Sequence, residues 1–287
     1  MEHVRWQNRP RLRRPVLLAA FEGWNDAADA ASSAAGYLKN RWGARPFASI
    51  DPEEFFDFSA TRPQVRLTDG ITREVVWPTN ELSAASLPES ARDVIVLCGS
   101  EPQLRWRTFC AQVLGVANEL GAELIVTLGA LLADVAHTRP VRVTGTAADP
   151  ALANQLGLER STYEGPTGIV GVLHDAFRTA EVPSASLWAA VPHYVAATPS
   201  PKAALALVRR TSSLLSTPLV TADLEQRAVD YENQVSEVVA TDDDVAAYVR
   251  RLEETLDTAA DKAPLEPQSG DVLAAEFERF LREQGGD

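Results

Sequence analysis

The chain has few of the residues that build disulfide frameworks and metal centres. Its 287 residues include two cysteines, Cys98 and Cys110, and four histidines. Two thiols are too few for a disulfide framework, and Cys98 ends an apolar run in which a buried thiol fits. The histidines lack recognised ligand spacing, so no metal site is predicted. We therefore expect a reducing, cytoplasmic location and no metal or other cofactor.

Long hydrophobic stretches are also missing. The arginine-rich first 15 residues are not followed by an apolar segment of signal-peptide length, and no window approaches a membrane span. Hydrophobic residues nevertheless make up 45% of the sequence and charged residues 23%, which allows a sizeable buried core. These features predict a folded protein without a membrane partner.

The commonest enzyme signatures are absent as well. The sequence contains no Gly-x-Ser-x-Gly nucleophile elbow, no Walker-type phosphate loop and no Gly-x-Gly-x-x-Gly dinucleotide fingerprint. Whether the chain catalyses a reaction is therefore left open by its motifs.

Negative charge is concentrated towards the C-terminus. Residues 221–287 hold 18 acids and 6 bases, a net charge of −12. The first 220 residues hold 22 acids and 21 bases, so they offer little attraction to a nucleic-acid backbone. We predict no nucleic-acid partner, and we divide the chain into an α/β core domain, residues 1–220, and an acidic helical region, residues 221–287.

Short apolar runs alternate with helical patterns through the first 220 residues. The predicted strands are 15–21, 93–98, 123–128, 141–144 and 186–191, and the predicted helices are 25–40, 105–120, 150–156, 167–180 and 201–215. This alternation predicts a largely parallel sheet with helices on both faces. Residues 45–78 interrupt it with a strand, a hydrophobic loop and a β-hairpin, which we place as an insertion at one sheet edge.

The C-terminal region has only a helical pattern. Apolar or small residues recur at spacings of four and three through residues 224–256, with one interruption. A threonine followed by three aspartates at 241–244 favours a helix start. We predict two helices joined near Ala240, packed antiparallel on each other, on the core or on a neighbouring subunit. A linker at 262–270 and a last helix at 271–282 are expected to follow.

Polar side chains follow the ends of several predicted strands, where an open parallel sheet gathers its ligands. The candidates for ligand binding are Glu22, Trp24, Asn25, Asp26, Glu101, Arg105, Trp106, His137, Arg139 and Glu164. Such groups can bind a small polar molecule, or they can cap helices and pair with one another. The loops that carry Glu22, Arg105 and His137 are expected to meet on one side of the sheet.

Six segments of these loops together carry a family resemblance. They are 21–27, 99–106, 127–130, 137–141, 163–168 and 191–194. Over roughly residues 15–260 the chain resembles the proteasome assembly chaperone 2 family, actinobacterial branch. The resemblance implies a three-layer α/β/α core similar to nucleoside phosphorylases and hydrolases, a C-terminal helical appendage and a homo-oligomer, with a trimer favoured.

The resemblance implies a protein-binding scaffold or assembly factor with a protein client, and no established reaction. Some eukaryotic relatives end in a hydrophobic-Tyr-X motif that docks between proteasome ring subunits, whereas this chain ends at 283–287 in Glu-Gln-Gly-Gly-Asp. Docking through that motif is therefore not expected. The alternative is a small-molecule enzyme or sensor. A deep pocket lined by the candidate residues favours that alternative, and mutual pairing without a cavity favours protein binding.

Overall fold

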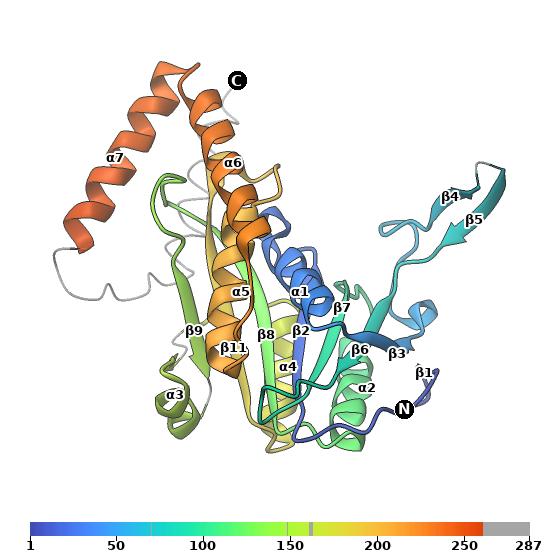
Figure 1. Cartoon of the computed structure of the whole chain (residues 1–287). Coiled ribbons are helices and arrows are strands. Elements are labelled where there is room, and N and C mark those ends of the chain that lie inside the picture. Colours follow the sequence, from blue (N-terminus) through green and yellow to red (C-terminus); the bar gives the residue numbers. More distant parts are fainter. Residues whose placement is uncertain (70, 148, 161–162, 261–287) are drawn as a thin grey trace.

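A computed structural model describes residues 1–69, 71–147, 149–160 and 163–260 (Figure 1). Within these ranges, nine strands form one sheet in the order β1-β3-β6-β7-β2-β8-β11-β9-β10. The strands are β1 Val4–Trp6, β2 Val16–Glu22, β3 Arg45–Ile50, β6 Asn80–Ala85, β7 Val94–Ser100, β8 Leu124–Ala133, β9 Val143–Ala147, β10 Glu159–Arg160 and β11 Ser184–Pro192. The fold is therefore of the mixed α/β class, as predicted.

The sheet is parallel in the centre and antiparallel towards both sides. Strands β7, β2, β8 and β11 run parallel, whereas β6, β3 and β1 continue antiparallel on one side and β9 pairs antiparallel with β11 on the other. The connections explain the change. Residues 86–93 and 134–142 contain no helix, and a parallel pairing needs a longer crossover. The predicted parallel arrangement is thus confined to the central strands.

Helices cover both faces of the central strands (Figure 1). Helices α1 Ala30–Arg41 and α5 Pro201–Leu215 pack on one face, and α2 Trp106–Glu119 and α4 Ile169–Thr179 pack on the other. Strand β2 shows how both faces of the sheet are buried. Val16, Leu18 and Ala20 belong to the core of the first face, and the residues between them belong to the core of the second.

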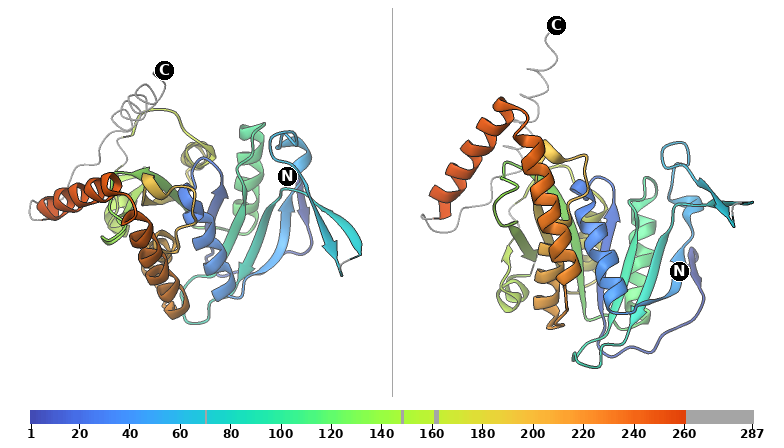
Figure 2. Two further views of the ribbon diagram at one scale, coloured as in Figure 1. Left: turned by 90° about the horizontal axis from the view of Figure 1, so that it is seen from above. Right: turned by 45° about the horizontal axis from the view of Figure 1, so that its top comes forward.

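The 45–78 insertion contains the predicted strand, loop and β-hairpin. Strand β3 joins the main sheet, but β4 Gln64–Thr68 and β5 Thr72–Val76 form a separate two-stranded sheet that projects from the body (Figures 1 and 2). Strands β1, β6 and β10 were not predicted, because they are short or rich in polar and small residues. Helix α3 Pro150–Leu156 was predicted with its correct bounds.

The C-terminal pattern folds into two helices, as predicted. They are α6 Ala222–Val239 and α7 Asp243–Ala260, and the Asp242 carboxylate accepts hydrogen bonds from the backbone of Asp244 at 2.9 Å and Val245 at 3.1 Å. The two helices diverge instead of lying alongside each other (Figure 1). Both pack on Ala136, Tyr194 and Val195, which agrees with the predicted arrangement in which the two helices lie together on the core.

Two other expectations concern the ends and the thiols. The linker predicted at 262–270 and the helix predicted at 271–282 lie outside the described residues. Cys98 and Cys110 are free thiols, and burial raises the pKa of each to about 12. Within the described ranges, no helix combines the length and the apolar character needed to cross a bilayer.

Candidate functional site

The loops after β2 and β7 meet at the carboxyl ends of these neighbouring strands. The backbone N–H of Glu101 donates to the Glu22 carbonyl at 2.8 Å, and the Ser100 hydroxyl donates to Glu22 Oε2 at 2.9 Å. The Asn25 carbonyl accepts a hydrogen bond from Ala130 of β8, also at 2.8 Å. Parallel pairing of β2 with both neighbours therefore places these loops at one edge of the sheet.

Glu101 links this edge to the start of α4. Its Oε1 accepts a hydrogen bond from the Asn25 side-chain amide at 3.2 Å and another from the backbone N–H of Ile169 at 2.7 Å. Ile169 is the first residue of α4, so the carboxylate faces the positive end of the helix dipole. Glu101 thus caps α4, and the two groups that donate hydrogen bonds to its Oε1 both belong to this chain.

Asp26 acts in the same way at the start of α1. Its Oδ1 accepts from the backbone N–H of Ala31 at 2.6 Å and of Ser32 at 3.2 Å. Burial raises the pKa of Asp26, against the lowering effect of these hydrogen bonds. Ala28 and Asp29, which lie between Asp26 and α1, have positive φ. For this reason the regular helix begins at Ala30 and not at the predicted residue 25.

Exposed aromatic and apolar side chains stand beside these paired polar groups. Trp24 directly precedes the buried Asn25, and 65% of it is exposed. Tyr163 and Leu104 are each almost half exposed, and the Tyr163 hydroxyl donates to the Pro166 carbonyl at 2.7 Å. The exposed side chains at this edge of the sheet therefore include more aromatic and apolar groups than the acidic residues in these loops indicate. Glu164, also exposed, lies in the same loop as Tyr163.

Arg105 and Trp106 face a different neighbour. Arg105 has φ +51° and forms an ion pair with Glu54, and the Trp106 indole donates to the Pro102 carbonyl. The adjacent Gln103 backbone donates to the Phe55 carbonyl at 2.9 Å. These contacts hold the hydrophobic loop of the 45–78 insertion against the body, so Arg105 does not join the Glu101 cluster.

His137 and Arg139 lie under the C-terminal helices. The Tyr194 hydroxyl oxygen accepts a hydrogen bond from the His137 backbone N–H at 2.8 Å, and the same hydroxyl pairs with His137 Nδ1, also at 2.8 Å. His137 Nε2 forms a hydrogen bond with the Ser236 hydroxyl of α6 at 3.0 Å. Burial lowers the pKa of His137, and the Lys202 ammonium lowers it further. The imidazole thus links the loop after β8 to Tyr194 and to α6.

Arg139 ties the same loop to α7. Its guanidinium bonds to Asp257 at 2.6 and 2.8 Å and to Glu253 at 3.4 Å. Lys202 of α5 adds a link to Glu232 of α6 at 2.5 Å. Sequence reasoning missed Ser236, Tyr194 and Lys202 as partners, because their positions relative to His137 depend on how α6 returns across the sheet.

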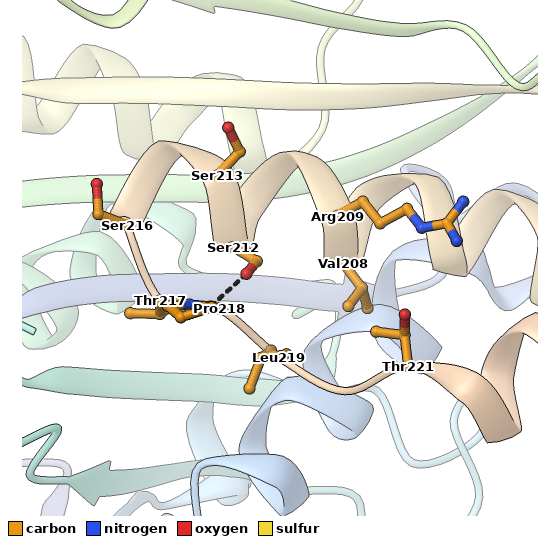
Figure 3. Close-up of a pocket in the computed structure, with 9 residues that line it drawn as sticks. All are labelled: Val208, Arg209, Ser212, Ser213, Ser216, Thr217, Pro218, Leu219 and Thr221. Atoms are coloured by element: carbon orange, nitrogen blue, oxygen red, sulfur yellow. Dashed lines mark hydrogen bonds between the residues drawn. The ribbon is translucent and has the colours of Figure 1, made fainter. Parts of the chain in front are cut away.

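The hollows in the structure do not gather the candidate residues. A groove of about 500 Å³ lies at the end of α5 (Figure 3) and is lined by Val208, Arg209, Ser212, Ser213, Ser216, Thr217, Pro218, Leu219 and Thr221. A hollow of about 10 Å³ touches His137 and Arg139, which is room for about one water molecule. In the described part of the chain, no three His, Cys, Asp or Glu side chains converge to hold a metal ion.

The candidate residues thus separate into a Glu101 cluster, an anchor for the insertion and an anchor for the C-terminal helices. Comparison with known protein families identifies the family of this chain. The model of the PAC2 family matches residues 20–239, which is more than half of the chain. The chain belongs to the PAC2 family. The match includes the strand-end loops and all of α6, and the resemblance drawn from those loops is confirmed.

Solved PAC2 structures support the same assignment. A PAC2 family protein from Streptomyces avermitilis is 48% identical, with a TM-score of 0.76 over 82% of this chain and 99% of that chain. A proteasome-assembly chaperone homologue from Mycobacterium tuberculosis has the same identity and coverage and a TM-score of 0.74. Both come from actinobacteria, the branch indicated by the sequence.

More distant structures share the PAC2 fold alone. An archaeal proteasome activator from Pyrococcus furiosus is 19% identical, with a TM-score of 0.67 over 82% of this chain and 97% of that chain. A search of curated proteins gives no match.

Proposed function

We propose that this chain is a protein-binding scaffold or assembly factor that uses the strand-end surface around Trp24. One observation carries the proposal. The polar side chains of this edge, Glu22, Asn25 and Glu101, hydrogen-bond within the chain, whereas the Trp24 side chain beside them is 65% exposed. Mutual pairing of this kind favours a contact surface over a small-molecule pocket.

The residues on either side of Trp24 fix its backbone. Asn25 and Asp26, which follow it, are both buried, and Gly23 before it has φ +120°, a conformation that favours glycine. A tryptophan held in this way loses little conformational freedom when a partner covers it, and tryptophan is enriched among residues that dominate binding energy. The geometry therefore supports Trp24 as an anchor for a protein client.

The class of client is proposed from the relatives. The Mycobacterium tuberculosis relative is named a proteasome-assembly chaperone homologue, so a proteasome component is the first client to test. We further propose a cytoplasmic homo-oligomer, with a trimer favoured, and no nucleic-acid or membrane partner. The phosphorylase- and hydrolase-like layering, and the division at residue 220, stay predictions.

Binding of purified proteasome subunits from the same cell to the full-length chain tests the proposal. Trp24→Ala is expected to weaken binding at least about tenfold, or about 1.4 kcal/mol. Val220→Ala is the matched control, because Val220 is also exposed but lies far along the chain, between α5 and α6. Equal affinities of wild type and Trp24→Ala would count against this surface. Native mass spectrometry that finds a retained small ligand and no subunit would instead support the enzyme or sensor alternative.

A further inference from the structure

The projecting hairpin of β4 and β5, here called the arm, comprises residues 64–69 and 71–77. Its strands pair in register, with Val65 opposite Val75 and Arg66 opposite Glu74. Because side chains alternate along a strand, Val65, Leu67, Val75 and Trp77 share one face. These four side chains are between 49% and 62% exposed. The arm therefore presents one largely apolar face, which also carries Arg73 opposite Leu67, and one polar face. All of its described residues except Val76 are exposed.

An arm of this kind is poorly supported by its own chain. A two-stranded hairpin is marginally stable in water unless a further surface packs on it. The ring contact of Trp77 with Phe58, with centroids 4.8 Å apart, lies at the base of the arm. Towards the tip, Leu67 and Ile71 extend into solvent, and Ile71 is 86% exposed. A partner that covers the apolar face is needed to stabilise this part of the hairpin.

The charges of the arm indicate what kind of partner fits. Residues 62–77 hold three arginines and two acids, a net charge of +1: Arg62, Arg66, Arg73, Asp69 and Glu74. None of the three arginines forms an ion pair with any residue that the structure describes. Most other arginines near the body are paired, for example Arg13 with Asp93 at 2.9 Å. A surface with exposed apolar groups and excess carboxylates therefore complements the arm.

Such a surface exists at the other end of this molecule. Residues 222–260, which form α6, α7 and their junction, hold 11 acids and 3 bases. On α6, Val229 is more than half exposed, and its neighbours Asp230 and Glu237 are exposed without a basic partner among the described residues. Figures 1 and 2 show the arm at one side of the body and α7 at the opposite side, with α6 beside α5 between them, so the arm does not cover its own α6.

We infer that the arm of one copy docks on the acidic outer surface of α6 and α7 of a second copy. This contact joins two different patches, so it repeats head to tail and closes into a ring when the rotation allows. Burial of the apolar face supplies the main free energy of association, and the arginines orient the arm through the acids. The inference rests on the homo-oligomer in the proposed function and names the interface that builds it.

The first experiment measures the mass of the full-length chain by native mass spectrometry and light scattering. The wild-type protein is expected to have the mass of two or more chains. The Leu67→Asp variant is expected to have the mass of a single chain and an unchanged circular-dichroism spectrum. Thr72→Asp is the matched control, because Thr72 lies on the polar face of the same hairpin, opposite Thr68. A single-chain wild type, or a Leu67→Asp variant with the wild-type mass, overturns the inference.

A charge exchange tests the receiving surface. The double change Arg66→Glu with Arg73→Glu is expected to weaken the assembly and to raise its Kd at least about tenfold. Adding Asp230→Arg and Glu237→Arg to the same chain is expected to restore it. Failure of that second pair to restore the mass overturns α6 as the receiving surface.

The same measurements separate this inference from the proposed client surface. Trp24→Ala is expected to retain the wild-type mass while it loses the client. A client loss without a mass change therefore concerns the proposed function alone, and a mass change in the arm variants concerns the interface.

Discussion

Gly168 shows how closely the loop before α4 approaches the Glu101 cluster. A Cβ atom at this position would lie 2.2 Å from Asn25 Nδ2 and 2.6 Å from Glu101 Oε1. Both atoms belong to side chains that are already hydrogen-bonded to each other. The helix cap made by Glu101 therefore depends on the absence of a side chain at residue 168.

Gly168→Ala is expected to destabilise the protein by about 1–3 kcal/mol, because the new methyl group must displace Asn25 or Glu101. Urea unfolding of the full-length chain measures the change. Gly36→Ala is the control: Gly36 lies within α1 and nothing stands within 4 Å of its added Cβ. The control is expected to be neutral or stabilising by up to about 1 kcal/mol. Equal stabilities for the two variants would contradict the close packing.

His174 is a histidine with a structural role and a strongly shifted pKa. Its Nε2 pairs with the Thr127 hydroxyl of β8 at 2.8 Å, and its Nδ1 pairs with the Ser184 hydroxyl of β11 at 2.9 Å. Desolvation by burial lowers the pKa of His174 from 6.5 to about 4. The folded state therefore binds fewer protons at this site than the unfolded chain between these two pH values.

The stability of the fold is expected to decrease as pH falls from 6.5 towards 4, because protonation favours the unfolded chain. The contribution of His174 is about 1–3 kcal/mol, since each pKa unit corresponds to about 1.4 kcal/mol and the ring is only partly enclosed. Chemical unfolding at pH 7 and pH 5 measures it. His174→Gln is expected to flatten the slope between these values, whereas His3→Gln, far from this site in the sequence, is expected to leave it unchanged.

At the scale of elements, α6 and α7 depend on surfaces that each helix alone does not provide. Tyr231, Val235 and Val239 of α6 are buried with Val249 and Leu252 of α7. The spacing of four and three counted from Leu224 predicts Val238 as a buried position, but Val238 is 67% exposed and Val239 is buried in its place. The seam shifts by one residue because α6 packs on the core as well as on α7.

Val235→Asp combined with Leu252→Asp is expected to detach α6 and α7 or to dissociate the assembly. Each buried Val or Leu contributes about 1.5–3 kcal/mol of transfer free energy, and a buried carboxylate without a partner adds a further cost. Thermal unfolding and light scattering measure the two outcomes. Glu237→Asp with Glu254→Asp is the control on exposed positions of the same helices. An unchanged Tm and mass in the first variant would refute the buried seam.

At the scale of the whole molecule, the acidic C-terminal region and the α/β body share a core. Leu224 and Ala228 of α6 belong to the same buried cluster as α1 and α5. Arg41 of α1 pairs with Asp223, and Arg209 of α5 pairs with Glu225 at 2.6 Å. Although composition changes sharply near residue 220, the packing continues across it.

A chain that ends at residue 220 is expected to be less stable than one that ends at residue 260. Loss of the Leu224 and Ala228 contacts costs about 2–3 kcal/mol, which corresponds to a decrease in Tm of about 5–10 °C for a domain of this size. Differential scanning calorimetry of the two shortened chains measures the difference. An equal Tm in both would show that residues 1–220 are an independent domain.

The sequence by itself determined the α/β class, the central strands, the break between α6 and α7 and the family. Each of these follows from local signals: apolar runs such as Val16–Phe21, the cap at Asp242, and short loop motifs. Local signals did not predict strand direction at the sheet edges, because short connections rather than propensities decide it.

Only the tertiary structure decided the partners of the candidate residues. Glu101 and Arg105 follow β7 and His137 follows β8, which are parallel strands of one sheet, yet the three residues contact α4, the insertion and α6 respectively. Their separation along the chain from these partners carries no signal in one sequence. Long-range packing brings a helix start, an acid and a hydroxyl to each of them, and those contacts make structural links out of residues whose chemistry also suits a binding site.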